Sequence, residues 1–184
     1  FKGIRPATKT TLVACQLLLF TTQWAIQGGL PADVAHAVLP LSGAAICGWL
    51  LLQPVTGSIA DIAASIFGLF YLGFLPSHWL SLRGLDNGLE ITLSACLMIV
   101  ATDIGSWAVG RHYGRRPLSP ISPGKTIEGA IGGFISAMLI GLVCGQRMGW
   151  PLHGLPGRLR GGLIALFALV GDMSESMMNR DAGV

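Results

Sequence analysis

Six long apolar runs dominate the pattern of hydrophobic and polar positions along the chain, and glycine, proline and charged residues separate them. Each run approaches the roughly 20 mostly apolar residues that a helix needs to cross a bilayer. Pro54 and Pro76 are expected to end the second and third helices, because proline does not continue the backbone hydrogen bonding of a helix. The predicted helices cover residues 10–27, 34–53, 57–76, 88–109, 129–146 and 159–178.

Composition agrees with this pattern. The chain is 52% hydrophobic and only 11% charged, with a mean hydropathy of +0.63, whereas soluble domains carry about 25% charged residues. We therefore expect an all-α integral membrane protein, a bundle of about six transmembrane helices in a single polytopic domain over residues 1–184. The 26 glycines suit close packing of such helices. Because the chain begins at Phe1, we expect it to be incomplete at its amino end.

The charge distribution suggests an orientation in the membrane. An even number of spans returns the chain to its starting side, which then carries eight basic residues against four on the other side. This excess favours a cytoplasmic location for the first side. We expect a bacterial-type cell (inner) membrane, with any active site facing the cytoplasm. Nucleic acid is not an expected partner, because no aromatic and basic surface accompanies the net charge of +3. The eight residues are Lys2, Arg5, Lys9, Arg111, Arg115, Arg116, Lys125 and Arg180; the four are Arg83, Arg147, Arg158 and Arg160.

A polar cluster follows the last apolar run. If this segment is helical, Asp172, Glu175, Ser176 and Asn179 fall at i, i+3, i+4 and i+7 and share one face. Arg180 borders that face and carries a guanidinium suited to phosphate. The face is typical of cation and phosphate binding. The alternative is a membrane helix that reaches water and ends in polar residues.

A second acidic residue is expected near this cluster. Asp103 lies fifteen residues into the helix predicted from Gly88, about 22 Å along its axis, and ionisable residues at membrane depth are usually functional. We expect Asp103 and Asp172 to approach the same membrane surface from two helices. The alternative is that Asp103 pairs with a nearby arginine. Asp61 and Glu90 are instead expected to be acids in the first turns of capped helices.

The longest polar loop, residues 110–128, supplies cations. Lys125 and Glu128 precede a glycine-rich helix start, whereas Arg115 and Arg116 have the alternative role of holding anionic lipid headgroups. The run from Gly124 to Thr126 resembles the end of a P-loop. We reject that interpretation, because Ser119 replaces the earlier glycine and no strand is expected before it.

Three motifs carry a family resemblance: Asp-x-Gly-x-Trp-x-x-Gly-Arg at 103–111, Ser-Pro-x-Lys-Thr-x-Glu-Gly at 122–129 and Gly-Asp-x-x-Glu-Ser at 171–176. Together they resemble phosphatidate cytidylyltransferase, also called CDP-diacylglycerol synthase, over about residues 57–184. The family signature opens with Ser-x-apolar-Lys-Arg, which residues 176–180 match except at Asn179. Its later Lys-Asp, His-Gly-Gly and Asp-Arg-x-Asp portions do not follow, so we expect a chain truncated at its carboxyl end.

The resemblance implies an enzyme of phospholipid biosynthesis that transfers CMP from CTP to phosphatidate, giving CDP-diacylglycerol and pyrophosphate. Its expected partners are CTP and phosphatidate in the bilayer, with a homodimer as one candidate assembly. Such a reaction brings two anions together, and metal ions and cationic side chains meet that demand. Mg²⁺ is the expected cofactor, because the available ligands are carboxylate oxygens, and the four scattered histidines suggest no zinc site.

The resemblance also implies individual roles, with Glu175 and Asp181 as secondary candidates. The glycines at 105, 110, 129, 132 and 133 are expected to permit either close helix packing or ligand approach. Other functions left open are a cation-coupled transporter using intramembrane aspartates, a CTP-using polyprenol kinase and a non-catalytic remnant of the enzyme. The implied roles are catalysis for Asp172, Ser176 and Arg180, substrate binding for Arg111, Lys125, Glu128 and Arg180, and metal binding for Asp172 and Asp103.

Overall fold

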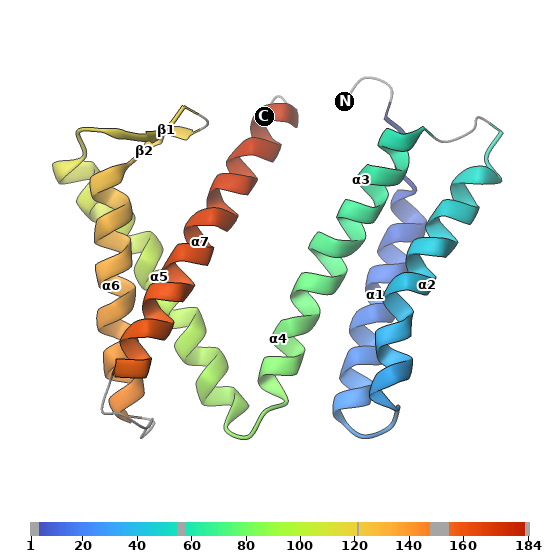
Figure 1. Ribbon diagram of the computed structural model, residues 1–184, viewed down its shortest axis with the longest axis horizontal. Coiled ribbons are helices and arrows are strands. Elements are labelled where there is room, and N and C mark those ends of the chain that lie inside the picture. Colours follow the sequence, from blue (N-terminus) through green and yellow to red (C-terminus); the bar gives the residue numbers. More distant parts are fainter. Residues whose placement is uncertain (1–3, 55–57, 121, 148–154, 183–184) are drawn as a thin grey trace. The chain divides into compact units, whose positions relative to one another are not determined.

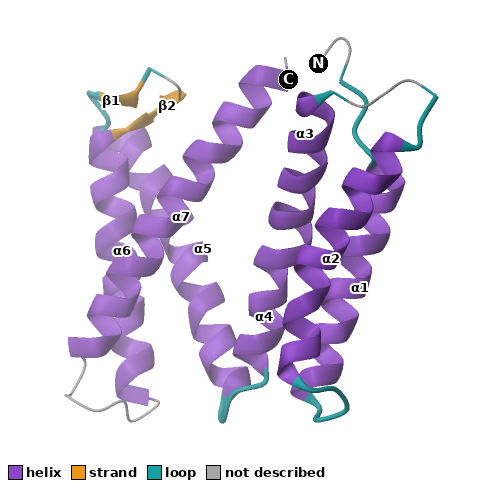
Figure 2. Ribbon diagram, turned by 45° about the vertical axis from the view of Figure 1, so that its right-hand side comes forward, coloured by secondary structure: helices purple, strands orange, loops and turns teal. Residues whose placement is uncertain are grey.

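The computed structural model describes residues 4–54, 58–120, 122–147 and 155–182, and these residues are mostly helical (Figures 1 and 2). Each predicted helix range is helical over most of its length; Lys2 and His153 lie outside the described residues. The elements in chain order are α1 (Thr8–Ile26), α2 (Ala32–Leu51), α3 (Ile59–Leu69), the π-helical η1 (Phe70–Phe74), α4 (Leu75–Arg83), α5 (Gly88–Tyr113), β1 (Pro117–Ser119), β2 (Ser122–Thr126), α6 (Ile127–Arg147) and α7 (Leu155–Ala182).

Among the described residues, four helical spans are long and apolar enough to cross a membrane. The chain is thus an all-α type of integral membrane protein, but the predicted count of six spans is not confirmed. Helix α1 carries several threonines and glutamines that lower its hydropathy. The four spans are Ile59–Arg83, Gly88–Tyr113, Ile127–Arg147 and Gly157–Asp181.

The predicted helix end at Pro76 was wrong. The segments α3, η1 and α4 follow one another without interruption as far as Arg83. A proline inside an α-helix loses a hydrogen bond and its ring clashes with the carbonyl four residues earlier, here that of Leu72. The π-helical stretch Phe70–Phe74 lies at this point and changes the hydrogen-bond spacing, which accommodates the ring. By contrast, α2 ends at Leu51, close to the break predicted before Pro54.

The purely helical prediction also missed a small sheet. Strands β1 and β2 pair antiparallel, with Pro117 opposite Thr126 and Ser119 opposite Ser122. The expectation that no strand precedes Gly124 was therefore wrong. Prolines are tolerated here because both strands of a two-stranded ribbon are edge strands. The P-loop interpretation still fails, because Lys125 lies within β2 and Ser119 stands where the motif requires glycine.

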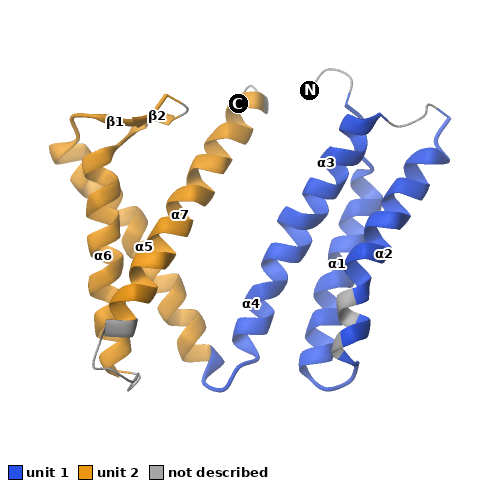
Figure 3. Ribbon diagram, in the orientation of Figure 1, with its two compact units in different colours: residues 1–88 blue, residues 89–184 orange. Residues whose placement is uncertain are grey.

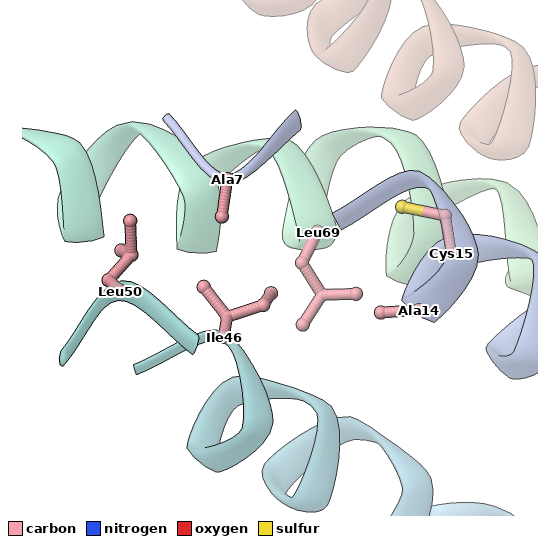
Figure 4. Close-up of a cluster of buried hydrophobic side chains, with 6 residues drawn as sticks. All are labelled: Ala7, Ala14, Cys15, Ile46, Leu50 and Leu69. Carbon is pink, nitrogen blue, oxygen red and sulfur yellow. The ribbon is translucent and has the colours of Figure 1, made fainter. Parts of the chain in front are cut away.

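Contacts divide the chain into two compact units, residues 1–88 and 89–184 (Figure 3). Each unit is described by itself, and the single polytopic domain stays a prediction. In the first unit, α1, α2 and α3 meet around a buried apolar cluster (Figure 4). Van der Waals packing of these side chains between the helices holds the unit together. The cluster consists of Ala7, Ala14, Cys15, Ile46, Leu50 and Leu69.

The start of α3 has the capping structure that the sequence predicted. Ser58 Oγ accepts a hydrogen bond from the Asp61 backbone N at 3.2 Å, and Asp61 Oδ2 accepts one from the Ser58 backbone N at 2.7 Å. Together they form a capping box. Asp61 Oδ1 also accepts a hydrogen bond from the Arg5 backbone N at 2.5 Å. Asp61 is thus a structural residue that joins the chain before α1 to the first turn of α3.

In the second unit, small residues bring three helices into close contact. A Cβ atom at Gly105 of α5 would overlap Ser136 Oγ of α6, and one at Gly161 of α7 would overlap the Ala137 carbonyl oxygen of α6. The same holds for the other glycines whose role was open: side chains at 110, 129, 132 and 133 would press on the facing helix or on Thr126. Close packing therefore accounts for these glycines, and it fixes α5 and α7 against α6.

Candidate functional site

The three sequence motifs meet at one end of the second unit. There α5 ends, α6 begins, α7 approaches its carboxyl end, and the β1–β2 hairpin joins α5 to α6 (Figure 1). The hairpin contacts α6 through both strands and α7 through β2. Residues 103–111, 122–129 and 171–176, which are far apart in sequence, thus contribute to one region of the fold.

Lys125 joins the hairpin to α7. Its Nζ lies 2.5 Å from Asp172 Oδ2 and 3.3 Å from Ser176 Oγ. The two α7 residues are one helical turn apart, so the prediction that they share a face is confirmed. Ser176 Oγ donates to the Asp172 backbone oxygen at 2.9 Å, which leaves its lone pairs to the lysine. The Lys125 side chain is 23% exposed and that of Asp172 52% exposed, so a ligand from solvent can reach both charges.

Asp103 brings a second carboxylate to this region from α5. It is exposed and interacts electrostatically with both Asp172 and Lys125. The predicted approach of Asp103 and Asp172 from two helices is therefore confirmed. No ion pair between Asp103 and an arginine occurs among the described residues, so the alternative partner is not observed. The result is one ammonium group near two carboxylates.

Glu128 lies in the first turn of α6 and points to the base of the hairpin. Its Oε2 accepts hydrogen bonds from the backbone N of Arg115 at 3.1 Å and of Arg116 at 3.3 Å. Sequence reasoning assigned no role to Thr126, whose Oγ1 accepts a hydrogen bond from the Gly129 backbone N at 3.1 Å. A hydroxyl residue just before a predicted helix was the available signal for this cap.

The two remaining predicted cations have other neighbours. Arg180 Nη1 donates to the Pro120 backbone oxygen at 3.3 Å, so α7 also contacts the tip of the hairpin. The Arg111 guanidinium lies 5.3 Å from the centroid of the Trp107 ring on the same helix, which is within cation–π range. In the described part of the chain, Arg111 makes no ion pair with Asp172 or Asp103.

An open depression lies along the last turns of α7. Its volume is about 550 Å³. Met177 and Met178 give it apolar surface, while Arg180 and Asp181 give it charge. Arg180 thus reaches both the hairpin tip and this depression.

The carboxylates fit a metal that arrives with its own ligands. Within the described residues, no group of three or more His, Cys, Asp or Glu side chains is placed to hold a metal ion. Mg²⁺, however, is usually held by one or two carboxylates together with substrate phosphates and water. Asp103 and Asp172 meet that smaller requirement if Lys125 leaves Asp172 and binds a substrate phosphate instead.

Comparison with known proteins decides the family. The model of the cytidylyltransferase family matches residues 1–184. The chain belongs to this family. This cytidylyltransferase is 39% identical to the phosphatidate cytidylyltransferase of Synechocystis sp. over 210 residues, which cover the whole chain and 70% of that protein. The resemblance inferred from the three motifs is thereby confirmed.

More distant relatives of this cytidylyltransferase carry the same name. Phosphatidate cytidylyltransferase 4, chloroplastic, of Arabidopsis thaliana is 34% identical over 73% of the chain and 41% of its own length. The phosphatidate cytidylyltransferase of Bacillus subtilis is 33% identical over 72% of the chain and 50% of its own length. The matched regions thus span about half the length of these two relatives. No solved structure matches the chain.

Proposed function

We propose that this cytidylyltransferase transfers CMP from CTP to phosphatidate, giving CDP-diacylglycerol and pyrophosphate. The observation that carries the proposal is the position of Lys125, which reaches Asp172 and Ser176 from a different motif. Membership of the cytidylyltransferase family and the names of the relatives support the choice of substrates. A transporter is less well supported, because the charged groups Lys125 and Asp172 lie at one end of the unit rather than midway along its helices, and the names of the relatives favour an enzyme over a non-catalytic remnant.

The chemistry requires two anions to meet. An oxygen of the phosphatidate phosphate attacks the α-phosphorus of CTP, and the bond from that phosphorus to the oxygen bridging to the β-phosphate breaks. Negative charge grows on the departing pyrophosphate, so cations fixed at that position stabilise the transition state. Lys125 suits this role, because a flexible ammonium group can exchange Asp172 for a phosphate oxygen without moving the backbone.

The other predicted residues have supporting roles in the proposal. Arg180 lines the depression on α7 and would offer its guanidinium to a CTP phosphate. Arg111 would meet the lipid phosphate near the end of α5. Ser176, which already contacts Lys125, would orient the ammonium group. Asp172 and Asp103 would hold Mg²⁺ together with CTP phosphates; when bound, the ion would neutralise phosphate charge.

The location in the cell is part of the proposal. We infer a bacterial-type cell membrane with the hairpin end of the second unit in the cytoplasm, which supplies CTP. Basic residues support this orientation, because more of them lie at the hairpin end of the unit than at the opposite end. We further propose that α1 and α2 bring the number of transmembrane helices to six. The hairpin end carries Arg111, Arg115, Arg116, Lys125 and Arg180; the opposite end carries Arg147, Arg158 and Arg160.

The test is product formation by the purified full-length protein in detergent micelles that contain phosphatidate. With CTP labelled at the α-phosphate, we expect label in the lipid fraction and release of pyrophosphate in equal amounts. Release of CDP with no label from the α-phosphate in lipid would indicate transfer of the γ-phosphate, as in a lipid kinase. Cation uptake into sealed vesicles without CTP, combined with no labelled lipid, would support a transporter and refute the proposal.

A further inference from the structure

We propose that Glu128 is a positioning residue, which fixes the base of the β1–β2 hairpin so that Lys125 is held at Asp172, and which touches neither substrate. This inference rests on the proposed function for its kinetic consequence. Its structural consequence, order at the base of the hairpin, can be measured without any substrate.

The first observation is where the carboxylate of Glu128 is directed. One oxygen, Oε2, accepts hydrogen bonds from two consecutive backbone amides, those of Arg115 and Arg116. These amides lie between the end of α5 and the start of β1, outside the ladder that β1 forms with β2. Hydrogen bonds from amides to a carboxylate are stronger than those between neutral groups. Glu128 therefore binds the incoming arm of the hairpin to the first turn of α6.

The second observation is that Glu128 is close to Lys125 along the chain, while its hydrogen bonds reach the other arm of the hairpin. Lys125 lies on the outgoing strand, three residues before Glu128. The Ile127 backbone N donates to the Arg116 backbone oxygen at 3.0 Å, which closes the hairpin base next to the Glu128 contacts. Arg116 directly precedes β1, and β1 pairs with β2, the strand that contains Lys125. Fixing Arg116 therefore helps to fix the position of Lys125.

The third observation is that the hairpin has a separate support at its tip. Arg180 of α7 donates to the Pro120 backbone oxygen. Lys125 therefore lies between two fixed points, one made by Glu128 at the base and one by Arg180 at the tip. A short two-stranded ribbon is only marginally stable alone, so such supports are needed to place a side chain reproducibly.

Charge also argues against a direct substrate contact by Glu128. Both proposed substrates are anionic at their phosphates, and an unprotonated carboxylate facing them would be repelled. The same carboxylate is favourable toward backbone amides. The sequence motif placed Glu128 with the substrate-binding residues, and its hydrogen bonds give a different reason for a glutamate at this position.

The test compares Glu128→Ala with Glu128→Gln in the full-length protein, with Glu90→Ala as the matched control. Glu90 is an exposed acid in the first turn of α5, at the opposite end of that helix from the hairpin. The amide oxygen of glutamine can still accept from both backbone N atoms, whereas alanine cannot. Without substrate, we expect hydrogen exchange at the Arg115 and Arg116 amides to be about tenfold faster in E128A. In E128Q and E90A, the exchange rates of these two amides should remain within about threefold of those in the wild-type protein.

Kinetics then test the link to Lys125. We expect kcat/KM for CTP to fall about 100-fold in E128A, because a misplaced catalytic group can cost that much, and to recover largely in E128Q. The double variant K125A/E128A should be no worse than K125A alone, because Glu128 acts through Lys125. Losses that multiply in the double variant would overturn the proposal.

Two further results would also overturn it. Unchanged exchange at Arg115 and Arg116 in E128A would show that Glu128 does not order the hairpin base. An E128Q protein with normal exchange but the low activity of E128A would show that the charge itself is needed at substrate or metal. If the wild-type protein forms no CDP-diacylglycerol, the proposed function fails, and the exchange experiment still decides whether Glu128 positions the hairpin.

Discussion

Replacing Lys125 with alanine separates the catalytic role of this residue from its contribution to stability. The variant removes an ammonium group that contacts Asp172 at 2.5 Å and Ser176 at 3.3 Å. If Lys125 stabilises charge on the phosphates during transfer, its loss should lower the rate by about 10²–10³-fold, as for other groups of this kind. The effect on folding should be much smaller.

The small effect on folding follows from exposure. With Lys125 23% and Asp172 52% exposed, water screens the pair, and such pairs contribute about 0.2–1 kcal/mol to the free energy of unfolding. The free energy of unfolding of a typical protein is about 5–15 kcal/mol, so the variant should remain more than about 99% folded. Destabilisation alone therefore cannot produce a 100-fold loss of activity.

The assay measures transfer of labelled CMP to phosphatidate over a range of CTP concentrations, with size-exclusion chromatography and thermal unfolding in the same detergent. Lys9→Ala is the control, because Lys9 is exposed on α1 and forms no ion pair within the described part of the chain. Lys125→Arg keeps the charge but changes its geometry, so partial activity is expected. Turnover of K125A within about threefold of wild type, with the protein folded, would refute the assignment of Lys125 to the phosphates.

Three further predictions use matched pairs or a single substitution. Asp172→Asn should abolish Mg²⁺-dependent product formation, whereas the control Asp86→Asn, in a loop, should not. Chelation by EDTA should inhibit the wild-type protein reversibly. Activity of D172N near the wild-type level would remove Asp172 from the site. Gly161→Ala should lower the thermal unfolding midpoint, because its Cβ would overlap the Ala137 carbonyl oxygen, whereas Gly171→Ala has free space and should stabilise by about 0.5–1 kcal/mol; equal effects would contradict the packing argument. Ser58→Ala should cost about 1 kcal/mol through loss of the capping box, measured by chemical denaturation, and no change would show that the cap is dispensable.

The sequence predicted the local features of the fold well. Apolar runs of sufficient length gave the helices, and the spacing of Ser58 and Asp61 gave the cap of α3. The face shared by Asp172 and Ser176 was likewise predictable, since it depends only on helical periodicity. The end predicted at Pro76 failed, because the π-helical stretch that accommodates a proline has no simple signature in the sequence.

The partners of the charged residues were harder to predict. Motif resemblance placed Lys125, Glu128 and Arg180 in one functional region, but it did not give their contacts in the fold. In the structure Lys125 binds a carboxylate, Glu128 binds backbone amides, and Arg180 donates to a backbone carbonyl. Nearly every residue has the same backbone N–H and carbonyl groups. Residue types alone therefore do not reveal which backbone group a side chain contacts.

By itself, the sequence therefore determined that the chain is a helical membrane protein, that it resembles the cytidylyltransferases, and which polar residues stand out from its apolar runs. These properties follow from hydropathy, from helical periodicity and from motif spacing, which are all read along the chain. Only the tertiary structure decided that Lys125 reaches Asp172, 47 positions later, and that the hairpin is held by Glu128 and Arg180. The reason is physical: the short proline-containing strands of the hairpin have weak local preferences. Their position is set by hydrogen bonds to α6 and α7, and close glycine packing in turn fixes α7 against α6.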